Sequence, residues 1–406
     1  MTGDKDGSVY IVQTQMQHQT IQEAASSSPI PPPPYPKMSA QQRPLDDYDE
    51  DLRPAVLEGH RAEVAAGNDW NTVEYQCWIR EDGARNQQKS VEKSDAFRYV
   101  PDVVKRHPDR GNIDLATVKP KGAEAGPRIP CIFFIHGGIR IGSNRFVGLE
   151  REGSKWAKWL NAMTVSVEYG LAPDKKATEQ LDNCYDALRH VFAQIKRGAA
   201  PFENVDVNKV IVYGASAGGG LALSLAIKWK NEQPNQALRG LFIEAGMLDD
   251  RDNTASCKQF KNTPMFNCTL KHLGWAAALG EDRAGKLKES DVKHWEAPAH
   301  AEADDLRRMP PTYMFVGSAD PLCDENKRMA RLLEEANVDV EARIWRGAFH
   351  GFFAAVPNAE ISIQAVRDGL GWMKRILGVE LGEAGYNKME LTRLPKLETY
   401  ISHTAT

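Results

Sequence analysis

The stretch VYGASAGGGLAL, residues 212–223, places one serine among small residues where an apolar run meets a helical pattern. Gly214, Ser216 and Gly218 fit the G-x-S-x-G spacing of a nucleophile elbow, and residues 210–213 supply the preceding strand. Small residues also collect at any tight strand-to-helix turn, where Ser216 would be an ordinary hydroxyl in a glycine-rich bend. The rest of the chain must therefore decide whether Ser216 is a nucleophile.

Strand and helix patterns alternate on both sides of this stretch. Strands are predicted at residues 72–79, 113–120, 129–138, 164–169, 209–214, 240–247, 311–318 and 340–347. Helices are predicted at residues 149–163, 180–195, 221–230, 325–337 and 365–377. The central runs are apolar throughout and are separated by helices. The pattern therefore predicts an α/β fold whose mostly parallel central sheet is flanked by helices.

The alternation stops between residues 248 and 310. This segment contains Trp, Phe and Leu but no strand pattern. Its mixed helical character predicts a cap over the carboxyl ends of the strands, where open α/β sheets bind ligands. A peripheral helical decoration is the alternative, because connecting segments commonly run over the protein surface.

The two ends of the chain carry weaker patterns. Residues 1–45 are rich in Gln, Ser and Pro and predict a disordered leader. Within it, SSSPIPPPPYPK (26–37) favours extended polyproline, either as a passive tail or as a ligand for a proline-docking domain. A helical pattern follows over residues 45–67, and residues 379–406 form a C-terminal tail without a functional signal. We therefore expect the folded domain to span residues 46–378.

The charge and hydropathy of the chain exclude several kinds of partner. The formal net charge is −4 at pH 7 over 406 residues. We therefore expect no nucleic-acid partner, and small, roughly neutral substrates meet no opposing field. No apolar run reaches the 18 residues of a membrane span, and the polar, acidic N-terminus does not fit a secretory signal. The expectation is a cytoplasmic protein without stable membrane insertion.

The cysteines are too dispersed to indicate a metal site. No pair has C-x-x-C spacing, so we expect neither zinc nor a dense disulfide framework. The six cysteines are Cys77, Cys131, Cys184, Cys257, Cys268 and Cys323.

A nucleophilic serine needs a base and a group that orients the base, each on a loop after a later strand. Asp320 and His350 each come just after a predicted strand, and the order Ser216, Asp320, His350 is that of an α/β-hydrolase. As alternatives, an Asp before Pro often begins a turn, Asp324 is a nearby competitor, and His350 could be an ordinary loop residue. The ordered triple favours the catalytic interpretation.

A glycine pair ends one of the early strands, at His136, Gly137 and Gly138. Ester hydrolysis places negative charge on the carbonyl oxygen, and glycine lets backbone N–H groups approach that oxygen closely. The amides of Gly137, Gly138 and Ala217, the residue after the nucleophile, are the predicted oxyanion hole. His136 has no role as a base here, and we expect it to bond the backbone and fix the loop.

These motifs resemble the hormone-sensitive-lipase-like carboxylesterase family of the α/β-hydrolase fold. The resemblance covers about residues 70–378 and rests on HGGI (136–139), VEYGLAPD (167–174) with DNCYDAL (182–188), GASAGGG (214–220), MPPTYMFVGSADPLCDE (309–325) and FHGF (349–352). It implies that Ser216, Asp320 and His350 form the triad. It also implies a cap formed by a helical segment near 46–70 together with residues 248–310.

Three positions depart from the family pattern. Ile139 stands where the family usually has a third glycine. Its amide remains a candidate donor, but its branched side chain restricts φ and narrows the mouth of the pocket. Ala215 and Gly170 stand where the family tends to have Asp and Arg. We interpret these differences as altered support around the pocket and not as loss of the reaction.

The sequence thus predicts a serine carboxylic-ester hydrolase that acts through an acyl-enzyme on a small or medium uncharged ester, with no cofactor and no metal. The same triad would serve a lactone hydrolase or an acyltransferase of secondary metabolism, and the fold could also serve as a non-catalytic ligand-binding receptor. Retention of His350 disfavours the receptor. An apolar helix face near residues 369–388 would suit a homodimer or would pack on the protein's own sheet.

Overall fold

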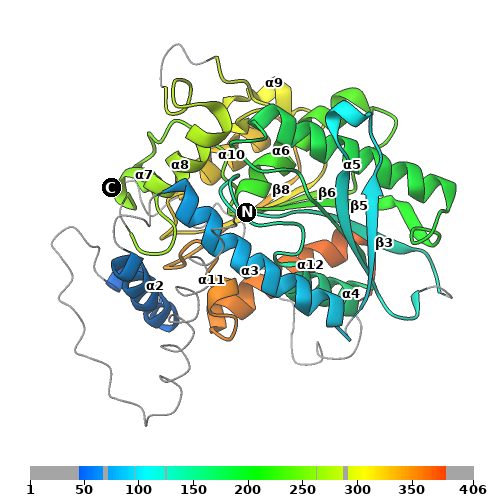
Figure 1. Ribbon diagram of the computed structural model, residues 1–406, viewed down its shortest axis with the longest axis horizontal. Helices are drawn as coiled ribbons and strands as arrows, with labels where there is room; N and C mark the ends of the chain where they lie inside the picture. The colour runs from blue at the N-terminus through cyan, green and yellow to red at the C-terminus, as the bar shows by residue number, and fades with distance from the viewer. Residues whose placement is uncertain are drawn as a thin grey trace, which may run out of the picture. The chain divides into compact units, whose positions relative to one another are not determined.

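An eight-stranded sheet forms the centre of the structure (Figure 1). The computed structural model describes residues 45–66, 72–95, 97–123, 126–261, 263–286 and 291–380. The predicted leader, apart from its last residue, and the tail beyond residue 380 lie outside the described residues.

The strands lie in the order β1-β2-β4-β3-β5-β6-β7-β8. They are β1 (Arg98–Val104), β2 (Ile113–Lys119), β3 (Ile129–Ile135), β4 (Met163–Val167), β5 (Val205–Ala215), β6 (Gly240–Glu244), β7 (Thr312–Gly317) and β8 (Val340–Trp345). Strands β3 to β8 pair in parallel, whereas β2 pairs antiparallel with both β1 and β4. The predicted α/β fold with a mostly parallel sheet is confirmed.

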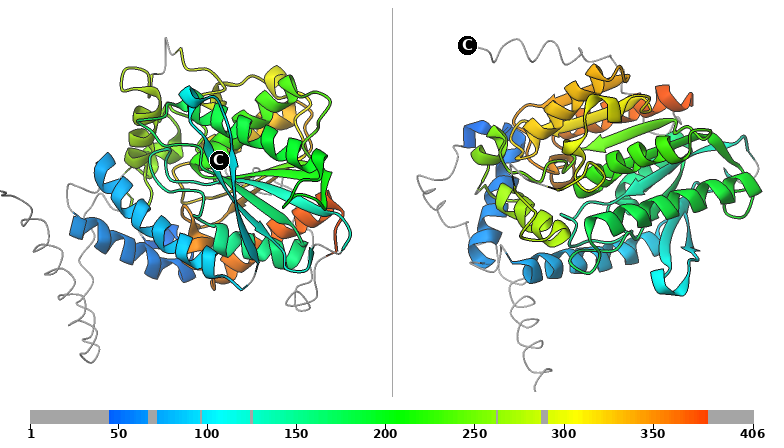
Figure 2. Two further views of the ribbon diagram at one scale, coloured as in Figure 1. Left: turned by 45° about the vertical axis from the view of Figure 1, so that its right-hand side comes forward. Right: turned by 90° about the horizontal axis from the view of Figure 1, so that it is seen from above.

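Helices cover both faces of the sheet because successive strand side chains point to opposite faces. Phe133 belongs to one buried cluster and Phe134 to the other. On the first face lie α5 (Ala177–Arg197), α6 (Ala217–Glu232) and α10 (Cys323–Glu335); on the second lie α4 (Ser154–Leu160), α11 (Phe352–Ala355) and α12 (Glu360–Leu377). Figure 1 shows these two layers above and below the strands, and the left view of Figure 2 keeps the same separation.

Helix α12 packs on the protein's own sheet, which was the alternative to a dimer face. Trp372 is buried against Phe242 of β6, with ring centroids 5.9 Å apart. At Gly369 a Cβ would lie only 2.9 Å from the Phe242 ring, so helix and sheet are in close contact there. The homodimer and the cytoplasmic location stay predictions.

The predicted strand at residues 72–79 is wrong, because these residues begin the helix α3 (Val73–Lys93). Alternating residues at 73–79 suggested a period of two. The following stretch is rich in Ala, Arg, Gln, Glu and Lys, which favour helix, and it contains no proline. A helix that propagates through this stretch overrides the short alternation.

Strand β1 was missed by the sequence analysis, although it adds the antiparallel edge of the sheet. Pro101 stands in its middle, and a proline cannot donate a ladder hydrogen bond. The edge position tolerates this proline, because only one side of an edge strand is paired.

Residues 248–310 contain helices and no strand within their described part. The helices are α7 (Ala255–Gln259), α8 (Cys268–Leu279), η7 (Pro298–His300) and α9 (Ala303–Leu306). A disulfide joins Cys257 to Cys268 and closes the loop between α7 and α8. The remaining helical segments are η1 (Leu45–Asp47), η2 (Glu50–Leu52), α2 (Arg53–Ala66), η4 (Pro108–Arg110) and the π-helical η6 (Leu149–Gly153). In the described ranges, no helix is both long and apolar enough to cross a membrane.

A buried ion pair fastens this insertion to the sheet domain. Lys271 of α8 and Glu325 of α10 are fully buried at their side chains, and Lys271 Nζ lies 2.7 Å from Glu325 Oε2. The other oxygen, Glu325 Oε1, accepts backbone N–H bonds from Leu248 (2.7 Å) and Asp249 (3.2 Å). Asp252 lies 3.2 Å from the same ammonium group. These contacts connect both ends of the insertion's first half to the start of α10.

Replacing Lys271 by Met should lower the free energy of unfolding by about 3–5 kcal/mol, because it leaves the Glu325 carboxylate buried without its cation. Chemical denaturation measures this loss. The matched control is Lys175→Met, which removes an exposed lysine paired with Glu179 on the surface of α5 and should change stability by less than about 0.5 kcal/mol. Equal stabilities of the two variants would contradict the proposed role of the buried pair.

Candidate active site

Ser216 occupies the sharp turn between β5 and α6 with φ +54° and ψ −118°. A positive φ is unfavourable for a residue with a Cβ, so the surrounding structure must hold this conformation. The Ser216 N–H donates to the Glu244 carbonyl (2.7 Å), and the Ser216 carbonyl accepts from Gly219 (2.9 Å) and Met247 (2.9 Å). Backbone bonds on both sides of the turn therefore stabilise a strained serine, as expected of a nucleophile elbow.

The glycines around Ser216 are required by close backbone contacts. A Cβ on Gly214 would lie 2.2 Å from the Gly218 carbonyl oxygen. A Cβ on Gly218 would lie 2.1 Å from the carbonyl oxygen of Ile135, at the end of β3. Both distances are far below van der Waals contact. The G-x-S-x-G spacing thus reflects the packing of the first turn of α6 against two strands.

The structure brings the three predicted triad residues together. His350 Nδ1 lies 2.8 Å from Asp320 Oδ2, and His350 Nε2 lies 2.9 Å from Ser216 Oγ. Because a carboxylate only accepts, Nδ1 donates to Asp320, and Nε2 is left to accept the Ser216 hydroxyl proton. Asp320 is fully buried, and its second oxygen accepts the Leu322 N–H (2.9 Å).

The competing aspartate Asp324 lies elsewhere. Its Oδ2 accepts the Ser256 N–H at 2.8 Å, and its Oδ1 lies 3.6 Å from Lys327 Nζ. Asp324 therefore joins α7 to α10, and His350 is bonded by Asp320.

The predicted oxyanion loop lies beside Ser216. A Cβ on Gly137 would lie 3.1 Å from the Ser216 Cβ, and Gly138 has a φ of +117° that only glycine adopts readily. The Gly138 carbonyl accepts from Ile141 (3.1 Å) and Gly142 (3.0 Å), so the loop turns back on itself. Among the described residues, no acceptor is bonded to the amides of Gly138 or Ile139.

Ile139, the departure from the family glycine, takes a φ of +47° and is buried. That conformation is unfavourable for a β-branched residue. It is held under α8, because a Cβ on Gly274 would lie 2.3 Å from the Ile139 carbonyl oxygen. The insertion therefore packs directly on the loop, and Ile139 lines the cavity above Ser216.

Two buried side chains, those of His136 and Arg140, hold the oxyanion loop in place. His136 Nδ1 bonds the Gly137 carbonyl (2.8 Å), and its ring stacks on Tyr169 with centroids 4.4 Å apart, in agreement with the expected role. Burial lowers the pKa of His136, which favours the neutral ring. Arg140, which the sequence analysis overlooked, is buried between Gln180 (Nη1 to Oε1, 3.1 Å) and the Trp275 ring (4.3 Å). It joins the loop to α5 and α8.

A cavity of about 490 Å³ opens at Ser216 and His350. Several of its lining residues were not foreseen, among them Gln87, Arg151, Glu244 and Phe266. The Phe266 ring lies 4.3 Å from the His350 ring, centroid to centroid, so the insertion contacts the base. Gln87 comes from α3, the helix whose first residues had been predicted as a strand. Glu244 had a usable signal, since it ends an apolar strand just as Asp320 and His350 follow theirs.

Glu244 has unusual electrostatics for a cavity wall. Burial raises its pKa to about 7, and the nearby Glu152 also raises it, whereas the Tyr213 hydrogen bond and Arg151 lower it. The Tyr213 hydroxyl donates to Glu244 Oε2 at 2.5 Å. Glu244 and Glu152 are thus two carboxyl groups that line this cavity.

Comparisons with known proteins agree with this fold and site. A family model described as alpha/beta hydrolase fold matches residues 132–354. Esterase LipI of Mycobacterium tuberculosis is 26% identical, covering 67% of this chain and 84% of its own. An esterase of Acinetobacter venetianus is 29% identical over 54% of this chain and 67% of its own. The solved structure of a bacterial heroin esterase has a TM-score of 0.69 and 26% identity over 82% of this chain and 99% of its own.

The fold and these matches define an ester-hydrolysing enzyme, and the predicted enzyme class is confirmed at that level. The chain belongs to the hormone-sensitive-lipase-like carboxylesterase family of the α/β-hydrolase fold.

Replacing Gly218 by Ala should lower the free energy of unfolding by about 1–3 kcal/mol, because the new Cβ meets a backbone oxygen that cannot move away freely. Thermal unfolding measures the change. Gly126→Ala is the matched control, since no atom lies within 4 Å of a Cβ built there. If the Gly218→Ala protein were as stable as the control, α6 could move away from β3 without a loss in the free energy of unfolding, and the prediction would be wrong.

Proposed function

We propose that the protein is a serine carboxylesterase that cleaves a small or medium uncharged ester through an acyl-enzyme. The observation that carries the proposal is the continuous chain of contacts from Ser216 Oγ to His350 Nε2 (2.9 Å) and from His350 Nδ1 to Asp320 (2.8 Å). This arrangement supplies a nucleophile, a base and a group that orients the base.

In the acylation step, His350 Nε2 takes the hydroxyl proton while Ser216 Oγ attacks the ester carbonyl carbon. The negative charge moves to the carbonyl oxygen, which backbone amides of the Gly137–Gly138 loop and of Ala217 would stabilise. The amide of Ile139 is an additional candidate, because it has no acceptor among the described residues. His350 then gives its proton to the leaving alkoxide, and the alcohol departs.

In the deacylation step, His350 takes a proton from water, and the resulting hydroxide attacks the acyl carbon. The second tetrahedral intermediate collapses to free acid and regenerates Ser216. Asp320 stabilises the imidazolium that forms in both steps, since its carboxylate lies 2.8 Å from Nδ1. These residues suffice for the reaction, and we propose that it needs no cofactor.

The size of the cavity supports a substrate of small or medium length. Its volume of about 490 Å³ lies in the lower part of the range of pocket volumes that bind drug-sized ligands. We further propose that residues 248–310 act as part of a cap. Phe266 against His350 and Gly274 against Ile139 support this, because both contacts bring the insertion over reacting groups. The segment near 46–70 remains a prediction as the cap's second part.

Replacing Ser216 by Ala should abolish hydrolysis of p-nitrophenyl butyrate and labelling by a fluorophosphonate probe, because no nucleophile remains. The control is Ser224→Ala, since Ser224 lies two turns further along α6 and its Oγ donates to the His294 carbonyl at 3.2 Å. Circular dichroism checks that both variants fold. Unchanged turnover in Ser216→Ala excludes this serine, whereas an unlabelled, inactive wild type favours the ligand-binding receptor.

Replacing Asp320 by Asn should lower kcat by about 10⁴-fold, since an amide no longer holds the histidine tautomer that accepts the serine proton. Stopped assays of p-nitrophenyl ester hydrolysis measure this fall. Asp324→Asn is the matched control, four residues further along in the first turn of α10, and should stay within about threefold of wild type, because its contacts lead to Ser256 and Lys327. A larger loss in Asp324→Asn would reassign the acid.

A further inference from the structure

The mechanism above leaves the carboxyl group of Glu244, which lines the cavity, without a task. Glu244 ends β6 beside the nucleophile, because β5 and β6 pair Ala215 with Glu244 and the Ser216 N–H donates to the Glu244 carbonyl (2.7 Å). Its side chain lines the same cavity as Ser216 and His350. A group bound at Glu244 would thus belong to a substrate already held at the triad.

Only half of the Glu244 carboxyl group is occupied by the protein. Oε2 accepts the Tyr213 hydroxyl at 2.5 Å, whereas no described residue donates to Oε1. Arg151, on the same cavity wall, donates from Nε to Glu152 Oε1 at 2.5 Å and lies over the Phe353 ring at 5.3 Å. Its two terminal nitrogens have no acceptor among the described residues. The wall therefore offers one open acceptor and open donors.

The charges of this group cancel. Arg151 and Lys155 are the cations, and Glu152 and Glu244 are the carboxyl groups; Glu152 Oε1 lies 3.4 Å from Lys155 Nζ. When all four are charged the cluster is neutral, so it does not attract a charged substrate group. An uncharged group that both donates and accepts fits best, and a hydroxyl is the smallest such group.

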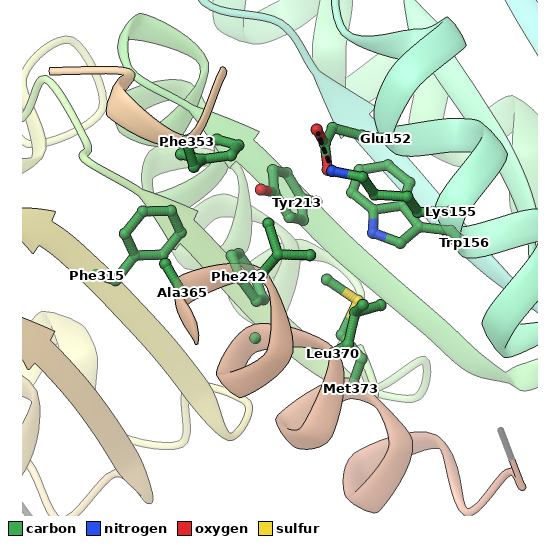
Figure 3. Close-up of a pocket in the computed structure, with 12 residues that line it drawn as sticks. Glu152, Lys155, Trp156, Tyr213, Phe242, Phe315, Phe353, Ala365, Leu370 and Met373 are labelled. Atoms are coloured by element: carbon green, nitrogen blue, oxygen red, sulfur yellow. Dashed lines mark hydrogen bonds and ion pairs between the residues drawn. The ribbon is translucent and has the colours of Figure 1, made fainter. Parts of the chain in front are cut away.

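Glu244 and Arg151 line the catalytic cavity, and the recess that lies next to this wall is too small for a substrate group. Figure 3 shows Tyr213, Glu152 and Lys155 beside a recess between α12 and the sheet, lined by Phe242, Phe315 and Met373 among others. The recess holds only about 20 Å³, room for roughly one water. A substrate group therefore approaches Glu244 and Arg151 from the side of Ser216.

We propose that Glu244 and Arg151 select esters that carry a hydroxyl group on the part of the substrate that extends from Ser216 along this wall. The hydroxyl donates to Glu244 Oε1 and accepts from a terminal nitrogen of Arg151. This inference rests on the proposed esterase function and names its substrate class. Glu244 and Arg151 are specificity residues, and neither takes part in bond cleavage.

The test compares pairs of esters that differ by one hydroxyl. On the acyl side, the pair is p-nitrophenyl 3-hydroxybutyrate and p-nitrophenyl butyrate; on the alcohol side, it is the monoacetate of 1,4-butanediol and butyl acetate. Each kcat/KM is divided by the rate of uncatalysed hydrolysis. Wild type should prefer the hydroxylated ester in at least one pair by about 10- to 100-fold, the usual effect of a hydrogen bond to a charged group.

Variants of Glu244 and Arg151 test whether these two residues cause the preference for the hydroxylated ester. Glu244→Leu should bring the ratio to about 1, Glu244→Gln should keep part of it through the amide oxygen, and Arg151→Met should lower it. The matched control is Glu179→Leu, which removes an exposed glutamate of α5 bonded to Lys175 and should leave both esters and their ratio unchanged.

The outcomes separate this inference from the proposed function. If wild type hydrolyses the plain esters and reacts with a fluorophosphonate but shows no preference in either pair, the hydroxyl site is refuted and the esterase stands. An unchanged ratio in Glu244→Leu refutes it too. Should that variant fail to fold, an unchanged ratio in both Glu244→Gln and Arg151→Met is equally decisive. A wild type that neither reacts nor hydrolyses any ester overturns both proposals.

Discussion

The close approach of the first turn of α6 to the end of β3 determines where the reacting groups lie. Gly218 permits this approach, because any Cβ there would meet the Ile135 carbonyl oxygen at 2.1 Å. The same contact brings the loop that follows β3 beside Ser216, so the proposed nucleophile and the proposed oxyanion donors are positioned by a single packing interaction. If a single added carbon atom pushed α6 away from β3, Ser216 and the loop that follows β3 would move relative to each other. The positive φ of Ser216 is a consequence of this tight turn.

The insertion, residues 248–310, contacts the candidate active site through a backbone contact, a ring contact and a buried ion pair. Ile139 packs under α8 through backbone contact with Gly274, and Phe266 contacts the His350 ring. The ion pair of Lys271 with Glu325 holds the same insertion to the start of α10, and Glu325 lies five residues after Asp320 in the sequence. The loop with the acid, the base and the oxyanion loop are therefore all contacted by one segment. Its sequence has no strand pattern, and its described part contains helices and no strand.

The sequence allowed the parallel sheet and the residues of the proposed triad to be identified because both leave local signals. Each of Asp320 and His350 follows an apolar strand, and the glycine spacing at Ser216 reports a steric requirement of the backbone. Gln87, Arg151 and Phe266 could not be found in this way, since they reach the cavity only through tertiary packing of α3, η6 and the insertion. Helix α3 was mistaken for a strand because a short alternation was weighed above the longer helical stretch. Strand β1 was missed because Pro101 is unfavourable everywhere except at an edge.

Two carboxyl groups near one histidine can serve different purposes if their surroundings differ. Asp320 is fully buried, accepts from His350 Nδ1 with one oxygen and accepts a backbone N–H with the other, so both of its oxygens are held in place beside the histidine. Glu244 contacts Tyr213 and not His350, and burial raises its pKa to about 7. Near neutral pH it is divided between its two protonation states, which makes it a poor permanent counterion for His350. A hydrogen-bonding role toward a substrate hydroxyl accommodates both states, because Glu244 Oε1 accepts from the hydroxyl when the carboxyl is ionised and donates to it when Oε1 is protonated.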